Sequence, residues 1–144
     1  MRINFIKLTE TAIAPFRGSD SAAGYDLFLD SNTDVVIEPH ETVKVHTGLA
    51  MEIPEGYFGG VFARSGLSTK EGLRPANCVG VIDSDYRGEI MIPLHNDSKS
   101  VRRVEPGTKI AQMIIMPYLQ VEYVEVDELS ETERGTNGFG STGK

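Results

Sequence analysis

The stretch TVKVHTGLAMEIPEGYFGGVFA, residues 42–63, has apolar side chains at every second position in two segments before a turn, the first of them at Val43 and Val45. Leu49, Met51 and Ile53 are apolar at every second position. Successive side chains of a β-strand point to opposite faces, so this spacing is typical of a strand with one face in a core. The Pro-Glu-Gly run at 54–56 favours a turn. The stretch therefore predicts neighbouring short strands.

Similar segments recur between the fifteen glycines and seven prolines of the chain. The expected strands are Ile3–Leu8, Tyr25–Leu29, Asp34–Ile37, Thr42–Thr47, Leu49–Ile53, Tyr57–Ala63, Val79–Ile82, Glu89–His95, Lys109–Met116 and Val121–Val126, with a short helix near Ser68–Gly72. About ten short strands at close spacing predict an all-β domain, either a sandwich, a jelly roll or a small barrel. We expect one β domain over residues 1–133 and a flexible glycine-rich C-terminal arm over residues 134–144.

The composition limits the function classes. A net charge of −7 and a pI near 4.9 argue against nucleic acid or an anionic membrane as the main partner. The single cysteine, Cys78, allows no internal disulfide and is expected to pack as a small hydrophobe in a strand. The three histidines have no zinc-ligand spacing, and residues 1–13 lack a signal-peptide core. We therefore expect a reduced, cytoplasmic location.

The arm, RGTNGFGSTGK at 134–144, matches both the dinucleotide pattern G-x-G-x-x-G and the P-loop pattern G-x-x-x-x-G-K. Both patterns need a helix directly after the glycines, whose N-terminal amides hold the phosphate. No residue follows Lys144 here, so neither site is expected. The arm still carries Arg134, Phe139 and exposed glycine amides, which suit a phosphorylated ring compound.

Three loops are richer in polar residues and glycine than a core requires: 22–26, 63–68 and 80–88. Arg64-Ser65-Gly66 follows an expected strand, and its guanidinium, hydroxyl and amides could converge on an anion. A surface turn capped by serine is the alternative interpretation.

Asp83 and Asp85 end another expected strand, next to Tyr86. One carboxylate can serve as a general base, but carboxylates two residues apart are also ordinary turn formers, and the spacing does not choose between them. Arg102 and Arg103 are expected in a solvated turn. Signatures of covalent acyl chemistry and of zinc hydrolysis are absent. A metal would therefore be Mg²⁺, held mainly by substrate phosphates and water rather than directly by the protein.

Five segments, taken in order, resemble the motifs of the homotrimeric deoxyuridine triphosphatase (dUTPase) family. They are SAAGYDL at 21–27, ARSGLS at 63–68, NCVGVIDSDYRGEI at 77–90, GTKIAQMI at 107–114 and RGTNGFGSTG at 134–143. The resemblance implies a jelly-roll domain and a homotrimer whose active sites are shared between subunits. It also implies Mg²⁺-assisted hydrolysis of dUTP to dUMP and pyrophosphate by water attack on the α-phosphorus. That reaction would keep uracil out of DNA and supply dUMP for thymidylate synthesis.

The resemblance also implies residue roles. Asp83 corresponds to the base that deprotonates the attacking water, and Asp26 to a supporting acidic residue. The implied substrate-binding residues are Arg64, Ser65, Gly66, Asn77, Val81, Asp83, Tyr86, Gln112, Arg134, Phe139, Gly140, Ser141 and Thr142. Among them Asn77 and the backbone from Cys78 onward read uracil, Tyr86 packs on the deoxyribose, and Phe139 stacks over the base.

The sequence departs from the family pattern at Asn137, where glycine is usual, and at Ala63 and Ser68. Asparagine tolerates a positive φ, so the arm can keep its turn. Two alternatives remain: a dCTP deaminase of the same fold, and a non-catalytic regulatory binding module related to dUTPases.

Overall fold

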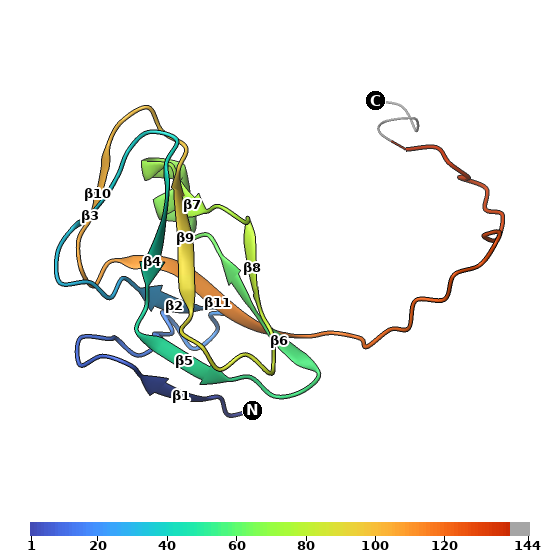
Figure 1. Ribbon diagram of the computed structural model, residues 1–144, viewed down its shortest axis with the longest axis horizontal. Helices are drawn as coiled ribbons and strands as arrows, with labels where there is room; N and C mark the ends of the chain where they lie inside the picture. Colours follow the sequence, from blue (N-terminus) through green and yellow to red (C-terminus); the bar gives the residue numbers. More distant parts are fainter. Residues whose placement is uncertain (139–144) are drawn as a thin grey trace.

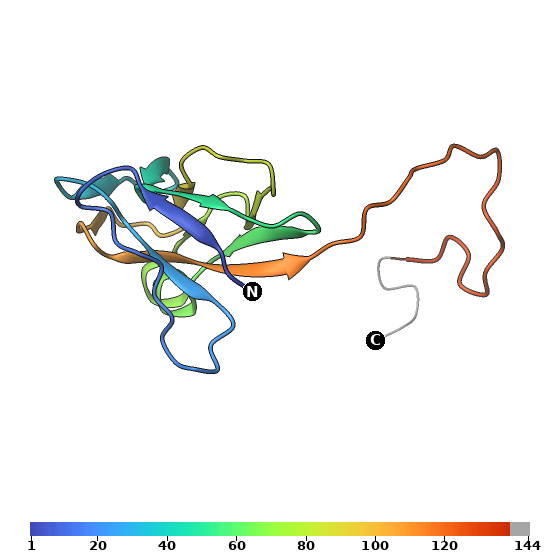
Figure 2. The ribbon, with the colours of Figure 1, turned by 90° about the horizontal axis from the view of Figure 1, so that it is seen from below.

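Short antiparallel strands build the body of the protein in the computed structural model, which describes residues 1–138 (Figures 1 and 2). The strands are β1 (Asn4–Lys7), β2 (Tyr25–Phe28), β3 (Val35–Ile37), β4 (Thr42–His46), β5 (Leu49–Glu52), β6 (Tyr57–Phe62), β7 (Leu73–Pro75), β8 (Val79–Ile82), β9 (Met91–Asn96), β10 (Arg102–Val104) and β11 (Lys109–Pro117). One short π-helical segment, η1 (Leu67–Glu71), follows β6 close to its expected place. The all-β prediction is confirmed.

Two larger sheets and two strand pairs form this body. One sheet has the order β2-β11-β6-β8 and the other β4-β9-β7, while β1 pairs with β5 and β3 with β10. Leu27 of β2 and Ile110 of β11 share one buried cluster with Ile92 and Leu94 of β9. Side chains from both larger sheets therefore meet in a single core, as in a jelly-roll-like sandwich.

The alternation seen in the sequence is what fills this core. In β9, Ile92 and Leu94 are at most 1% exposed, while Met91 and Pro93, which alternate with them, are partly exposed. Each such strand buries one apolar row and leaves the other row accessible, which explains why period two predicted these strands correctly.

Two three-residue strands were not predicted. β7 pairs with β9, and β10 pairs with β3. The expectation that Arg102 and Arg103 lie in a solvated turn was wrong, because both belong to β10, where they pair with Ile37 and Val36. Arg102 also contacts Glu71. Its Nη1 lies 3.0 Å from Glu71 Oε2, and its Nε donates to the Glu71 carbonyl at 2.7 Å.

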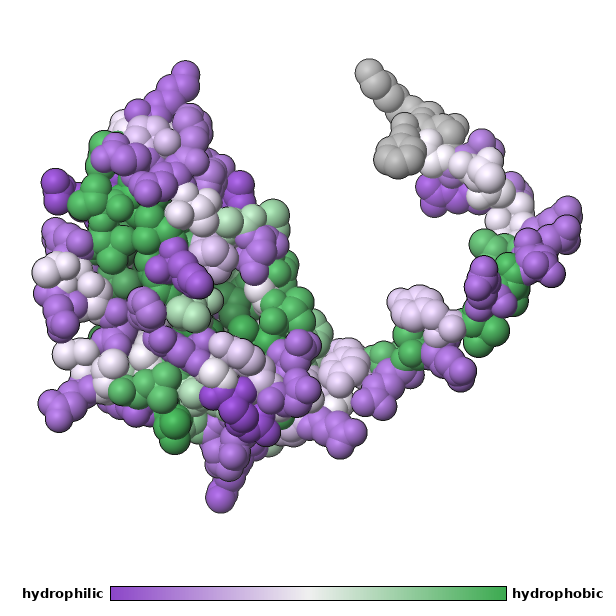
Figure 3. All heavy atoms as spheres, viewed as in Figure 1, coloured by the Kyte–Doolittle hydropathy of each residue, from purple (hydrophilic) through white to green (hydrophobic). Residues whose placement is uncertain are grey.

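The expected strand Val121–Val126 is absent from the described structure. After β11 the chain runs away from the body, and apolar side chains recur along it in the open (Figures 1 and 3). Val121 is 62% exposed and Tyr123 95%. A strand forms only where a partner supplies backbone hydrogen bonds, and within residues 1–138 this segment has no partner. Across the same residues, no helix is long and apolar enough to span a membrane.

Candidate functional site

A hydrogen-bonded turn follows β8 and carries the predicted base. We call residues 83–88 the acidic hairpin. The Tyr86 N–H donates to the Asp83 carbonyl at 3.2 Å, and the Tyr86 hydroxyl donates to the Glu89 carbonyl at 2.9 Å. A side chain at position 88 would collide with the Tyr86 ring, so Gly88 lets that ring lie across the turn. Hydrogen bonds therefore fix Tyr86 both at its backbone N–H and at its hydroxyl.

The Arg87 side chain also stabilises this turn. Its Nη1 donates to the Ser84 carbonyl at 2.6 Å and to the Tyr86 carbonyl at 3.0 Å. The basic residue of the hairpin is thus occupied with backbone, which leaves the neighbouring acidic side chains open to solvent.

The Asp83 side chain is exposed and, within residues 1–138, has no hydrogen-bond or ion-pair partner. It borders a surface hollow of 220 Å³ that Val81, Tyr86 and Lys44 also line. Val81 is 60% exposed and Tyr86 41%. A free carboxylate beside an apolar wall and an aromatic ring can hold a water molecule against a bound ligand.

A second group of predicted residues meets on the four-stranded sheet. We call Asp26, Arg64 and Lys109 the ion-pair cluster. Asp26 Oδ1 accepts the Arg64 Nε–H at 2.8 Å, and Oδ2 lies 2.8 Å from Lys109 Nζ. The Asp26 side chain is only 15% exposed. In β11, Gln112 lies opposite Asp26, and its Nε2 donates to the Ala63 carbonyl at 3.0 Å.

The predicted phosphate-binding turn begins directly after this cluster. Gly66 has helical angles, φ −63° and ψ −44°, and directly precedes η1. The Thr69 hydroxyl donates to the Ser65 carbonyl at 2.6 Å, which closes the turn. Ser65 and Gly66 are exposed, so the expected helical opening is present and accessible.

The loop between β7 and β8 contains Asn77 and Cys78, and both are exposed. Cys78 does not pack in a strand, so that expectation was wrong. It has a φ of +62°, a left-handed conformation that prevents it from continuing an extended strand.

The two groups of predicted residues lie at opposite ends of the sheet. β8 pairs with β6 so that Val79 faces Phe62 and Ile82 faces Gly59. Asn77 therefore lies at the end of β6 that leads into Arg64, whereas Asp83 follows the far end of β8, roughly 10 Å along the strand. The hollow beside Asp83 contains no residue of the ion-pair cluster. One chain does not assemble these residues into one cleft.

The described residues of the arm, 134–138, lie away from the body (Figure 1). Arg134 Nε donates to the Asn137 carbonyl at 2.8 Å, far from the sheets (Figure 1). Phe139, Gly140, Ser141 and Thr142 lie outside the described residues.

The donor atoms present fit a metal held by a ligand's phosphates. Within residues 1–138 no group of three or more His, Cys, Asp or Glu side chains is placed to hold an ion. Both carboxylate oxygens of Asp26 are paired with cations, whereas Asp83 and Asp85 at the acidic hairpin are exposed and have no hydrogen-bond or ion-pair partner within residues 1–138. One or two carboxylates with phosphate and water oxygens are the usual surroundings of Mg²⁺.

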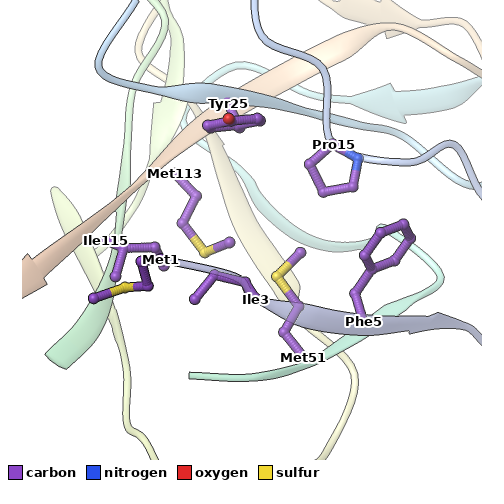
Figure 4. Close-up of a pocket in the computed structure, with 8 residues that line it drawn as sticks. All are labelled: Met1, Ile3, Phe5, Pro15, Tyr25, Met51, Met113 and Ile115. Atoms are coloured by element: carbon purple, nitrogen blue, oxygen red, sulfur yellow. The ribbon is translucent and has the colours of Figure 1, made fainter. Parts of the chain in front are cut away.

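An apolar groove of 320 Å³ lies apart from all of these residues (Figure 4). Its walls come from the N-terminus with β1, the segment before β2, and the strands β2, β5 and β11. The lining residues are Met1, Ile3, Phe5, Pro15, Tyr25, Met51, Met113 and Ile115. It contains no predicted catalytic or binding residue, and its lining suits packing rather than phosphate chemistry.

The fold and the site define a jelly-roll-like β domain with an exposed carboxylate hairpin and a separate cationic cluster. The sequence profile of the dUTPase family matches residues 10–143. The deoxyuridine 5'-triphosphate nucleotidohydrolase of Hydrogenobaculum sp. (strain Y04AAS1) is 49% identical over 143 residues, covering 99% of each chain. That of Nautilia profundicola is 46% identical over 144 residues, covering 100% of each. The solved structure of the Staphylococcus bacteriophage 80alpha dUTPase with dUPNHPP is 33% identical, with a TM-score of 0.90 and 99% coverage of both chains. The chain belongs to the dUTPase family.

Sequence reasoning missed three residues that shape these regions. Lys109 completes the ion-pair cluster, Glu89 accepts the Gly48 N–H at 2.9 Å below the acidic hairpin, and Arg74 contacts the Asn77 loop. Lys109 and Glu89 lie inside quoted motifs and could have been considered there. Arg74 has no sequence signal, because its partners become neighbours only in the fold.

Proposed function

We propose that this protein hydrolyses dUTP to dUMP and pyrophosphate. The observation that carries the proposal is the exposed, unpaired Asp83 beside Tyr86, in a chain that matches the dUTPase family over nearly its whole length. By releasing dUMP the enzyme would keep uracil out of DNA and supply the precursor of thymidylate.

Asp83 acts as the general base in this proposal. Its carboxylate takes a proton from a water molecule whose oxygen forms a bond to the α-phosphorus. The bond from that phosphorus to the bridging oxygen of the β-phosphate breaks, and the electron pair leaves with pyrophosphate. General bases of this kind typically contribute about 10²- to 10⁴-fold in rate. An open carboxylate suits this role, because a paired one would be a weaker acceptor.

The phosphates would bind at the ion-pair cluster and the turn after it. Arg64, Ser65, Gly66 and Gln112 would contact them, together with Arg134, Ser141 and Thr142 from the arm. Asp26 holds Arg64 by its Nε, so the guanidinium presents its remaining N–H groups in a fixed direction. In this proposal Asp26 supports the reaction by positioning Arg64, a phosphate-binding residue, since both oxygens of Asp26 are engaged in ion pairs.

Mg²⁺ would be bound by the substrate phosphates and water. When bound, the ion offsets phosphate charge and fixes the shape of the triphosphate chain. The residues of this chain that work beside it are Asp83, which orients the water, and the arginines, which offset the charge on the leaving group.

Base and sugar would be read at the Asn77 loop and the acidic hairpin. Uracil presents an N3–H donor beside the O4 acceptor, and cytosine reverses both, so a slot built for uracil leaves groups unpaired with cytosine. Val81 would line this slot. The Tyr86 ring would pack on the deoxyribose and leave no room for a 2′-hydroxyl. Phe139 and Gly140 would cover the base when the arm closes.

We also propose that the active form is a homotrimer with shared active sites. Two observations support it: the base and the phosphate ligands lie at opposite ends of one sheet, and the segment 121–126 exposes apolar side chains. A second copy can bring Asp83 to the ion-pair cluster of the first. Segment 121–126 of a neighbour would cover the apolar groove beside β1 (Figure 4). Strand β1 pairs only with β5 within residues 1–138, so its other edge is free to pair with that segment.

The direct test is an assay of the hydrolysis of dUTP, dTTP, dCTP and UTP, with and without Mg²⁺, in which the release of pyrophosphate is measured. We expect dUTP to be hydrolysed at least about a hundredfold better than the others, and only with the divalent ion. Ammonia release from dCTP would instead identify the deaminase. Binding of dUTP without turnover would favour the regulatory module.

Cys78 offers a second test, because it is exposed next to Asn77. Saturating dUMP should slow alkylation of this thiol by iodoacetamide, since the base would lie against the loop. Equal rates with and without dUMP would contradict the assignment of the uracil slot.

A further inference from the structure

The loop that would read uracil contains a strained turn. Cys78 has a φ of +62°, and the N–H of Val79 donates to the carbonyl of Asn77 at 2.6 Å across it. A hydrogen bond from residue i+2 to residue i, with a positive φ between them, defines the rare form of the γ-turn. For a residue with a side chain this conformation is unfavourable, and it persists only where the surroundings hold it.

Arg74, the middle residue of β7, contacts the turn and can hold it in this conformation. Its Nη1 donates to the Pro75 carbonyl at 3.1 Å, and lies 3.5 Å from the Ala76 carbonyl and 4.0 Å from Cys78 Sγ. The Pro75 carbonyl also accepts the Cys78 N–H at 3.1 Å. One guanidinium nitrogen is therefore in contact with three of the residues that lead into the turn.

Asp97 fixes the direction of that guanidinium. Its carboxylate accepts Arg74 Nε at 2.6 Å and Nη2 at 3.0 Å, the two-bond geometry that restricts an arginine most. The backbone N–H of Asp97 donates to the Gly72 carbonyl at 2.8 Å. The hydrogen bonds that Arg74 donates to Asp97 raise the pKa of Arg74 against the opposing effect of burial. The pair is thus anchored to β7 and to the residue that follows β9, two strands that pair with each other (Figure 1).

We infer that Arg74, held by Asp97, is a positioning residue that sets the turn at Cys78 and with it the slot for the base. The inference rests on the proposed function, because it assigns base reading to this loop. Relaxing Cys78 to a negative φ would rotate the adjacent peptide groups. The donors and acceptors that distinguish uracil from cytosine would then point elsewhere, while Asp83 at the far end of β8 would stay in place.

The test compares Arg74→Gln with Arg102→Gln, a control that removes another partly exposed arginine bound to a carboxylate and a carbonyl. We expect Arg74→Gln to raise KM for dUTP about tenfold and to lower the preference for dUTP over dCTP about tenfold, with kcat within about twofold. Arg102→Gln should change neither. Unchanged KM and preference in Arg74→Gln would overturn the inference. Failure of the wild-type protein to hydrolyse dUTP would instead overturn the proposed function.

A rescue experiment separates positioning from a general loss of stability. Glycine adopts positive φ without strain, so Cys78→Gly added to Arg74→Gln should recover at least half of the lost affinity for dUMP, measured by calorimetry. No recovery would show that Arg74 does not act through the turn. Asp97→Asn provides a milder variant should Arg74→Gln fold poorly. We expect a smaller KM rise in the same direction, and an unchanged KM and preference would overturn the inference.

Discussion

The ion-pair cluster and the acidic hairpin differ in the surroundings of their carboxylates. Asp26 is largely buried, and both its oxygens are bound to cations. Asp83 is exposed and unpaired within residues 1–138, although its hairpin contains an arginine. Pairing fixes a group and makes it a poor base, whereas an open carboxylate can accept a proton. The paired carboxylate is therefore assigned to substrate binding and the unpaired one to the chemical step, and the predictions below test these assignments.

The largest effect is expected at the open carboxylate. Asp83→Asn should lower kcat for dUTP about 10³-fold while leaving dUTP affinity within about threefold, because the amide fills the same space and cannot take a proton. Stopped-flow turnover and calorimetric binding measure the two quantities. Asp85→Asn is the matched control, two residues away in the same hairpin, and should stay within about fivefold of wild type. Wild-type turnover in Asp83→Asn would contradict the assignment.

Removal of residues 134–144 should have the second-largest effect on the hydrolysis of dUTP. We expect the shortened protein to fold and to keep its oligomeric state, since the described part of this segment does not contact the body. Its kcat/KM should fall about a hundredfold, because phosphate ligands are lost and water enters the site. Light scattering and steady-state kinetics test both parts. A shortened protein with the kcat/KM of the full chain would make the arm irrelevant.

A smaller change is expected at the paired carboxylate. Asp26→Asn leaves Arg64 and Lys109 without their counter-charge, so unfolding by urea should become easier by about 1 to 2 kcal/mol. KM for dUTP should rise about tenfold with little change in kcat, the reverse of the Asp83→Asn pattern. Asp20→Asn, at an exposed position, should change neither quantity. A fall in kcat alone for Asp26→Asn would assign it to the chemistry.

The smallest effect concerns pH. Hydrogen bonds from Arg74 are the main cause of the lowered pKa of Asp97, and the charges of Arg74, His95 and His40 act in the same direction. A lowered pKa in the folded state means that the contribution of the pair is complete above the ordinary value of 3.8 and is lost only below it. The ratio of KM between Asp97→Asn and wild type should therefore be constant from about pH 5 to about pH 8. A ratio that falls towards pH 5 would contradict this.

The sequence predicted those parts of the fold that have a local signal. The alternation at Leu49, Met51 and Ile53 identified a strand with a buried face, and all three side chains are at most 5% exposed. β7 and β10 have three residues each, too few to show a period, and they form because other strands offer partners. Val121–Val126 has the composition of a strand, but strand formation depends on a partner that one chain does not provide.

In the site, too, the residues with a local sequence signal were predicted and the contacts that depend on the fold were not. The motif residues were predicted because their types and order resemble a family, and Asp83 and Tyr86 do share one hollow. The pairing of Asp26 with Lys109 and of Arg74 with Asp97 could not be predicted. These partners are far apart in the sequence, and only strand register brings them together. The separation of Asp83 from Arg64 was likewise invisible before the register of β6 and β8 was known.

The central claim is that one active site combines Asp83 of one subunit with Arg64 of another. Asp83→Asn and Arg64→Gln should each be inactive alone, and refolding them together in equal amounts tests the claim directly. Random assembly would then give about a quarter of the sites both native residues, so about a quarter of wild-type dUTP hydrolysis should return. If both residues of a site came from the same chain, the mixture would remain inactive.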